Sequence, residues 1–159
     1  MTGCGLDAVV LRVFNPVGPG APAGSLPGRL AAELRRAGPG GRISTGGLGA
    51  YRDFVDARDV AEAAVRAVTA PGPLPAVLNI GSGTARPVRD VAEGLLAAAG
   101  FTVRIDEDGD GSPRSAAVPW QQADIAAATR ALGWSPRHSF ADSLAALWSA
   151  TQERAGESV

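Results

Sequence analysis

The sequence contains no lysine, one tyrosine (Tyr51), one histidine (His138) and one cysteine (Cys4). A mechanism that needs a lysine, a tyrosine–lysine pair or two histidines therefore cannot be assembled from these residues alone. The single cysteine excludes an internal disulfide bond and any metal site built only from cysteines.

The net charge and the length of the hydrophobic runs argue against further classes of protein. The formal net charge is -1 and the arginines are scattered along the chain, so we predict no nucleic-acid partner. No apolar run is long enough to cross a membrane, and the start of the chain has no signal-peptide pattern. We therefore expect no membrane partner and a cytoplasmic location. With 159 residues, 45% of them hydrophobic, the chain suits one globular unit.

The hydrophobic pattern predicts alternating strands and helices, which is typical of the α/β class. Residues 8–14 and 77–80 resemble strands buried on both faces of a parallel sheet. Such strands normally have neighbours on each side, and the pattern predicts no such neighbours within this chain. The pattern thus indicates part of a larger α/β unit. Helices are predicted at 26–37, 57–69, 87–99, 125–132 and 140–154, with Pro87 as a first helical residue and with Ser139 and Asp142 as a capping box.

Three shorter runs also favour strands. Residues 42–45 and 51–55 could pair with each other as a small ribbon, and residues 101–105 alternate as a strand does. Gly81-Ser82-Gly83 is better explained as a tight connection after a strand than as a phosphate loop.

The segment from Tyr51 to Ala61 carries most of the chemistry. It places five charges, Arg52, Asp53, Asp56, Arg58 and Asp59, where a short strand meets a helix. Strand ends and helix starts are where α/β folds bind ligands. The aspartates could act in acid–base chemistry, but capping and pairing with Arg52 or Arg58 is the favoured interpretation. His138 is expected to be an exposed loop residue.

Several segments resemble the extended short-chain dehydrogenase/reductase family, which comprises NAD(P)-dependent sugar-nucleotide epimerases and dehydratases. Residues 11–20 resemble its Leu-Arg-x-Phe-Asn-x-x-Gly-Pro segment, and residues 52–61 resemble its Arg-Asp-Phe-Val-His-Val-Asp-Asp-Val-Ala segment. Asn79 to Gly83 matches its Asn-Ile-Gly-Ser-Gly turn. Arg114, Asp124-Ile125, Leu132-Gly133-Trp134 and Pro136 match motifs near its C-terminus.

The resemblance covers only the C-terminal half of that family. It implies the last part of a doubly wound, Rossmann-type parallel sheet plus a small α/β substrate-binding lobe, within a single unit of residues 1–159. Residues 7–15 and 56–83 would supply late strands and a helix of the sheet, and residues 16–55 and 84–155 the sugar-nucleotide lobe. NAD or NADP is implied as cofactor, but the family's Gly-rich loop and Tyr-x-x-x-Lys pair have no counterpart here.

The resemblance also implies individual site residues. Arg52 and Arg114 would contact the diphosphate of a sugar nucleotide, and Asn15, Ser25, Leu26, Ser44 and Thr45 would complete the substrate site. Phe14 would face the nicotinamide. The structural alternatives are an ion pair of Arg52 with Asp53 or Asp56, a solvated loop arginine at 114, a turn asparagine, a helix cap at Ser25 and a core phenylalanine. Ala117 stands where the family often has an acid, which puts ribose recognition in doubt.

The sequence therefore predicts the substrate-binding half of an NAD(P)-dependent nucleoside-diphosphate-sugar epimerase, dehydratase or reductase. No catalytic or metal-binding residue is assigned, and the chain alone is expected to be inactive. Its predicted partners are a nucleoside diphosphate sugar and a complementary N-terminal half or a homodimer partner. The alternative is a non-catalytic module that binds a sugar nucleotide or a partner, or an inactive remnant.

Overall fold

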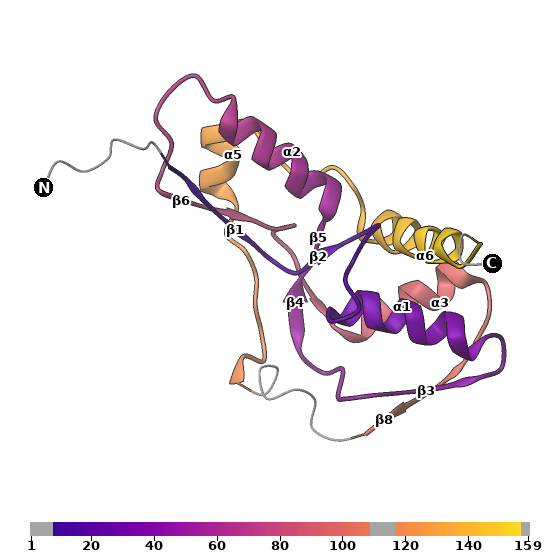
Figure 1. Cartoon of the computed structure of the whole chain (residues 1–159). Coiled ribbons are helices and arrows are strands. Elements are labelled where there is room, and N and C mark those ends of the chain that lie inside the picture. Colours follow the sequence, from indigo (N-terminus) through magenta and orange to yellow (C-terminus); the bar gives the residue numbers. More distant parts are fainter. Residues whose placement is uncertain (1–7, 109–116, 157–159) are drawn as a thin grey trace, which may run out of the picture.

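The computed structural model describes residues 8–108 and 117–156, and its strands and helices alternate along the chain (Figure 1). This confirms the α/β class. The elements are β1 (Val10–Val13), β2 (Pro16–Val17), α1 (Leu26–Ala37), β3 (Arg42–Thr45), β4 (Tyr51–Asp53), β5 (Val55–Asp56), α2 (Ala57–Val68), β6 (Val77–Ile80), β7 (Ala85–Pro87), α3 (Arg89–Ala99), β8 (Arg104–Glu107), α5 (Ala126–Leu132) and α6 (Phe140–Gly156).

The strands pair between segments that are distant in the sequence. β1 and β6 are parallel, with Val10 opposite Val77 and Val13 opposite Ile80. β2 pairs with β5 and β3 with β8, both in parallel, whereas β4 and β7 are antiparallel. The predicted ribbon between residues 42–45 and 51–55 is therefore wrong. Each of these strands instead finds its partner beyond α2.

Local capping explains where the helices begin and end. The Ser25 hydroxyl accepts a hydrogen bond from the Gly28 amide (3.2 Å), and Gly38, with φ of 67°, ends α1 at the predicted position. The predicted helix start at Pro87 is wrong. Val88 donates its amide to the Ala50 carbonyl (2.8 Å), which keeps this segment beside β4 until α3 begins at Arg89.

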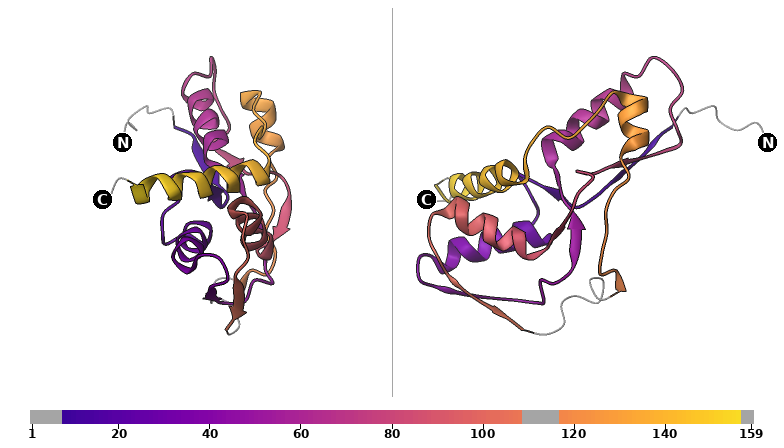
Figure 2. Two further views of the ribbon diagram at one scale, coloured as in Figure 1. Left: turned by 90° about the vertical axis from the view of Figure 1, so that its right-hand side faces the viewer. Right: turned by 180° about the vertical axis from the view of Figure 1, so that it is seen from behind.

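The buried side chains form two clusters. The larger one joins α1, α3, α6 and β3 and includes Leu30, Leu34, Leu95, Leu147 and Trp148. The smaller one joins β6, α2 and α5 and includes Leu78, Ile80, Ala63, Ala128 and Trp134. Two further views show the same division: α2 and α5 flank β1 and β6, while α1, α3 and α6 pack together elsewhere (Figure 2).

One face of the β1–β6 pair is uncovered in the described residues. Val9 and Leu11 pack against the smaller cluster, but Val10 is 59% exposed and Val77 is 42% exposed. Successive side chains of a strand point to opposite faces, and α2 and α5 contribute to the cluster on one face only. The expectation that both strands are buried on both faces is therefore wrong. None of the helices in the described residues is long and apolar enough to cross a membrane.

Candidate substrate groove

A groove of about 910 Å³ opens where the first turn of α1, the loop after β3 and the β4–β5 segment meet. It brings together five of the seven predicted substrate residues: Asn15, Ser25, Leu26, Thr45 and Arg52. Its other walls include Pro22, Arg29, Leu48, Phe54 and Val88. The described residues that line it include two arginines and no acidic residue. An electropositive groove of this kind suits an anionic ligand.

Arg52 on β4 presents a guanidinium group to this groove. Its Nη1 donates to the carbonyl of Tyr51 (2.7 Å). Among the described residues, no carboxylate lies within 4 Å of its guanidinium, so the ion pair with Asp53 or Asp56 is not formed. The remaining donors of Arg52 can therefore serve a bidentate acceptor such as a phosphate.

Asn15 is tied into the floor of the groove. Its Nδ2 donates to the Asp53 carbonyl (2.7 Å) and to the Gln121 side chain (3.2 Å). Both amide hydrogens are thus engaged within the protein. A ligand would meet Asn15 through its side-chain oxygen, which is a hydrogen-bond acceptor.

Asp53, next to Arg52, is fully buried and organises the segments behind the groove. Its carboxylate accepts hydrogen bonds from the Ser82 amide (2.6 Å) and hydroxyl (2.8 Å), the Gly83 amide (2.9 Å) and the Ala123 amide (3.0 Å). This agrees with a structural role for Asp53, although its partners are not the predicted arginines. It also means that the Ser82 and Gly83 amides are already engaged and do not face a phosphate.

The other predicted residues in the groove have different environments. The Ser25 hydroxyl caps α1 and donates to the Pro22 carbonyl (2.8 Å). Leu26, half-buried, begins the helix. Thr45 on β3 is only 4% exposed, and its Oγ1 has no hydrogen-bond partner in the structure. A buried hydroxyl without a partner is costly, so Thr45 stands out from its surroundings.

Three predicted residues are not placed in the groove. Ser44 is exposed and donates to Asp108 (2.5 Å) on the other side of β3 from Thr45. Phe14 is half-buried just after β1, and its amide donates a hydrogen bond to the Ile80 carbonyl (2.9 Å). Arg114 lies outside the described residues.

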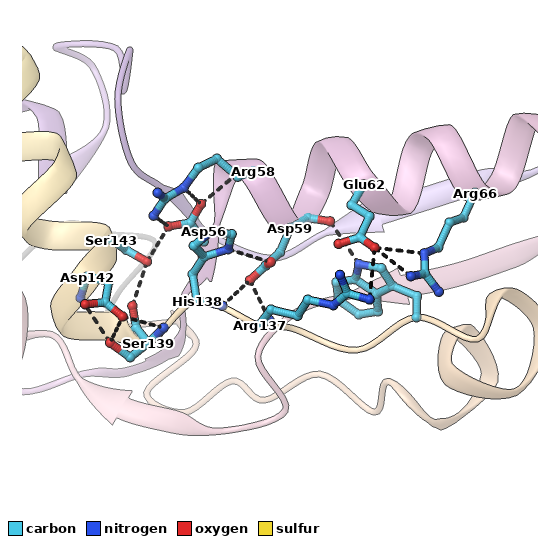
Figure 3. Close-up of polar contacts among 11 residues, drawn as sticks. Asp56, Arg58, Asp59, Glu62, Arg66, Arg137, His138, Ser139, Asp142 and Ser143 are labelled. Atoms are coloured by element: carbon cyan, nitrogen blue, oxygen red, sulfur yellow. Dashed lines mark hydrogen bonds and ion pairs between the residues drawn. The ribbon is translucent and has the colours of Figure 1, made fainter.

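The charged corner at the start of α2 is a structural network (Figure 3). Asp56 caps α2 through the Arg58 amide (2.8 Å) and pairs with the Arg58 guanidinium (2.7 Å). Ser143 on α6 donates to the same carboxylate (2.6 Å). Burial alone would raise the pKa of Asp56, but the hydrogen bonds from Arg58 and Ser143 outweigh it and lower the pKa to about 2. The predicted capping and pairing of Asp56 are confirmed.

Asp59 anchors the segment that precedes α6 (Figure 3). Its buried carboxylate accepts from the amides of Arg137 and His138 (3.1 Å each) and contacts the His138 ring nitrogen (2.7 Å). His138 lies in the loop between α5 and α6, as predicted, but it is half-buried, so its predicted exposure is wrong. Because 79 residues separate it from Asp59, no local pattern could have indicated this contact.

Sequence reasoning missed Arg29, which lines the groove from the first turn of α1. The available signal was an arginine four residues after the helix cap, an unusual place for a cation because the N-terminal end of a helix carries a partial positive charge. A second cavity, of about 300 Å³, lies near Asp56, Arg86 and His138, and Phe54 lines both cavities.

Comparisons with known proteins match the chain to one family model and to several relatives. The family model described as "NAD dependent epimerase/dehydratase family" matches residues 1–81. The chain is similar to dTDP-6-deoxy-L-talose 4-dehydrogenase (NAD(P)(+)) of Kitasatospora kifunensis, with 38% identity over 91% of this chain and 46% of the relative.

Two solved structures share the fold. One is RMD from Pseudomonas aeruginosa complexed with NADPH, at a TM-score of 0.82 and 27% identity, covering 94% of this chain and 50% of that one. The other is a mutant UDP-glucuronic acid 4-epimerase from Bacillus cereus in complex with UDP-4-deoxy-4-fluoro-glucuronic acid and NAD. Its TM-score is 0.77 and its identity 25%, and the match covers 94% of this chain and 46% of that one. The chain thus spans about half the length of each protein it matches.

Proposed function

The chain belongs to the NAD dependent epimerase/dehydratase family, and from this membership we propose that it is the substrate-binding half of a sugar-nucleotide epimerase, dehydratase or reductase. The groove would hold a nucleoside diphosphate sugar. The observation that carries the proposal is the convergence of Asn15, Ser25, Leu26, Thr45 and Arg52, predicted independently from the sequence, on one groove without acidic walls.

Each side chain would have a distinct task in this site. Arg52 would neutralise the diphosphate, because its guanidinium matches two phosphate oxygens. The Asn15 oxygen would accept a hydrogen bond from a ligand hydroxyl, and Leu26 and Phe54 would provide apolar contact. Arg114 would add a second contact to the diphosphate, and Ser44, which faces away from the groove, remains a prediction from resemblance.

NAD or NADP would supply hydride transfer when bound, and Phe14 would lie near its nicotinamide. The glycine-rich turn after β6, at residues 81–83, does not fit the dinucleotide phosphates, because the Ser82 and Gly83 amides already donate to Asp53. The Gly-rich loop and the Tyr-x-x-x-Lys pair would have to come from other residues, in another polypeptide or in more of this one.

A non-catalytic sugar-nucleotide-binding module is the second candidate. It is favoured by the absence of lysine from these 159 residues, because the family's proton donor works beside a lysine. Turnover separates the two candidates. If a polypeptide that carries Tyr-x-x-x-Lys restores turnover when mixed with this chain, the chain is the substrate half of an enzyme. Binding without turnover in such mixtures supports the module, and turnover by the purified 159 residues would contradict both.

Titration calorimetry tests the groove directly. We expect the chain to bind one of a panel of UDP-, dTDP- and GDP-sugars, and we expect Arg52→Ala to weaken that binding at least tenfold. The matched control is Arg36→Ala, which removes an exposed arginine from the last turn of α1, away from the groove. Equal affinity in the two variants would contradict the assignment of Arg52. The cytoplasmic location stays a prediction from the sequence.

A further inference from the structure

A second guanidinium shares the groove with Arg52. Arg29 reaches it from the first turn of α1, whereas Arg52 reaches it from β4. We propose that Arg29, in the first turn of α1, forms a further phosphate contact, so that side chains from α1 and β4 hold the diphosphate together. This inference rests on the proposed function and extends it to a residue that neither the motifs nor the comparisons assign.

The position of Arg29 is unfavourable for the free helix. The N-terminal end of a helix carries a partial positive charge, and cations there are destabilising. The first turn of α1 contains no acidic residue that would offset Arg29. An anion bound at this end would be attracted by the helix and by the guanidinium together. The first turn of α1 is therefore expected to be more stable with a phosphate bound than without one.

Arg29 also lacks the carboxylate partner that its spacing offers. Glu33 follows four residues later on α1, a spacing that commonly allows an ion pair. Within the described part of the chain, however, no carboxylate lies within 4 Å of the Arg29 guanidinium. The Arg66–Glu62 pair does form, at 2.6 Å, with the glutamate first, which is the more favourable order. The Arg29 guanidinium is thus available to a ligand in the groove.

Thr45 gives independent evidence that the groove receives a polar ligand. It lines the same groove, it is 4% exposed, and its hydroxyl has no hydrogen-bond partner in the structure. Buried hydroxyl groups nearly always find a partner. A ligand oxygen or a ligand-bound water entering the groove would supply one.

The backbone holds the first turn of α1 in place. A Cβ added at Gly28 would lie 2.4 Å from the Pro22 carbonyl oxygen, so the helix packs closely against the loop before it. The Ser25 cap fixes the same turn. Arg29 therefore starts from a defined position, which reduces the ordering cost of binding.

The test compares a nucleoside diphosphate with its nucleoside. The 159-residue chain is titrated with UDP, dTDP and GDP, and the tightest of these is then compared with uridine, thymidine or guanosine. We expect Arg29→Ala to weaken the binding of the diphosphate about tenfold, as for the loss of one charge-assisted hydrogen bond. The affinity for the nucleoside should be unchanged. Arg29→Lys should recover part of the loss, and Arg36→Ala should behave as the wild type. Thermal melts by circular dichroism establish that each variant is folded.

The outcomes separate this inference from the proposed function. If the wild-type chain binds none of the three diphosphates, the proposed function fails and this inference with it. If Arg52→Ala weakens the diphosphate while Arg29→Ala matches Arg36→Ala, only the role of Arg29 is overturned. Equal loss of nucleoside and diphosphate in Arg29→Ala also overturns it, because the residue would then act on the base or the fold.

Discussion

At the scale of single residues, two buried aspartates in the same short segment perform different structural tasks. Asp53 gathers four donors from the turn after β6 and from the segment before α5. Asp56 and its partners join β5, α2 and α6. Neither carboxylate lines the groove with Arg52. The aspartates therefore fix the frame in which the arginines meet a ligand.

Asp53→Ala should be strongly destabilising. The change leaves donors from Ser82, Gly83 and Ala123 without an acceptor, and unsatisfied buried donors typically lower the free energy of unfolding by about 3 kcal/mol in total. Urea unfolding measures it. Asp124→Ala is the control. Among the described residues, the carboxylate of the exposed Asp124 accepts only the Ala126 amide (2.9 Å), so its loss should cost less than about 1 kcal/mol. Similar losses in both variants would contradict the role of Asp53.

Asp56 should make stability depend on acid pH. Its pKa is about 2 in the folded protein against an ordinary value of 3.8, so its contribution is complete above about pH 4 and is lost as the pH falls through 2. The shift corresponds to about 2 kcal/mol. Urea unfolding at pH 7, 4 and 2.5 should show this loss in the wild type and a shallower decline in Asp56→Asn.

A residual decline is expected in that variant. Hydrogen bonds from Ser139 lower the pKa of Asp142, and a hydrogen bond from Arg89 lowers that of Glu107. Both carboxylates therefore also lose stabilising contacts as the pH falls. An Asp56→Asn profile parallel to that of the wild type over pH 4 to 2.5 would refute the assignment to Asp56.

At the scale of elements, the capping box of α6 is a direct link from sequence to structure. Ser139 accepts from the Asp142 amide (3.1 Å), and its hydroxyl donates to the Asp142 carboxylate (2.6 Å). Ser139→Ala should therefore lower the free energy of unfolding by about 1 kcal/mol. The control Ser149→Ala changes an exposed serine within α6 and should have almost no effect or stabilise slightly. A neutral Ser139→Ala would show that the cap does not contribute.

The elements also show what a sequence can predict. The bounds of α1 were predictable because Ser25, Pro27 and Gly38 fix both ends through local chemistry. The pairing of β3 with β8 and of β4 with β7 was not predictable, because the sequence of a strand of three or four residues does not specify which strand, about 35 to 60 residues away, it pairs with. The substrate groove follows the same division: family motifs predicted Arg52 and Asn15. The sequence places Arg29 in the first turn of α1, but no motif indicated that it lines the same groove as Arg52.

At the scale of the whole molecule, the β1–β6 pair leaves an apolar face uncovered within the described residues. Val10 and Val77 lie on that pair, and Val68 at the end of α2 is 87% exposed. Exposed apolar patches and open strand edges favour association. The chain spans about half the length of the relatives named above.

We therefore expect the 159-residue chain to self-associate reversibly through this surface. Sedimentation velocity over a concentration series should show a rising weight-average mass for the wild type. Val10→Thr combined with Val77→Thr should reduce that rise, because hydroxyl groups lower the apolar area while β-branching preserves the strands. Val118→Thr is the control, since Val118 is equally exposed, at 42%, but lies outside β1 and β6. A wild-type chain that stays monomeric throughout, or an equal effect of the control, would show that β1 and β6 do not form the contact.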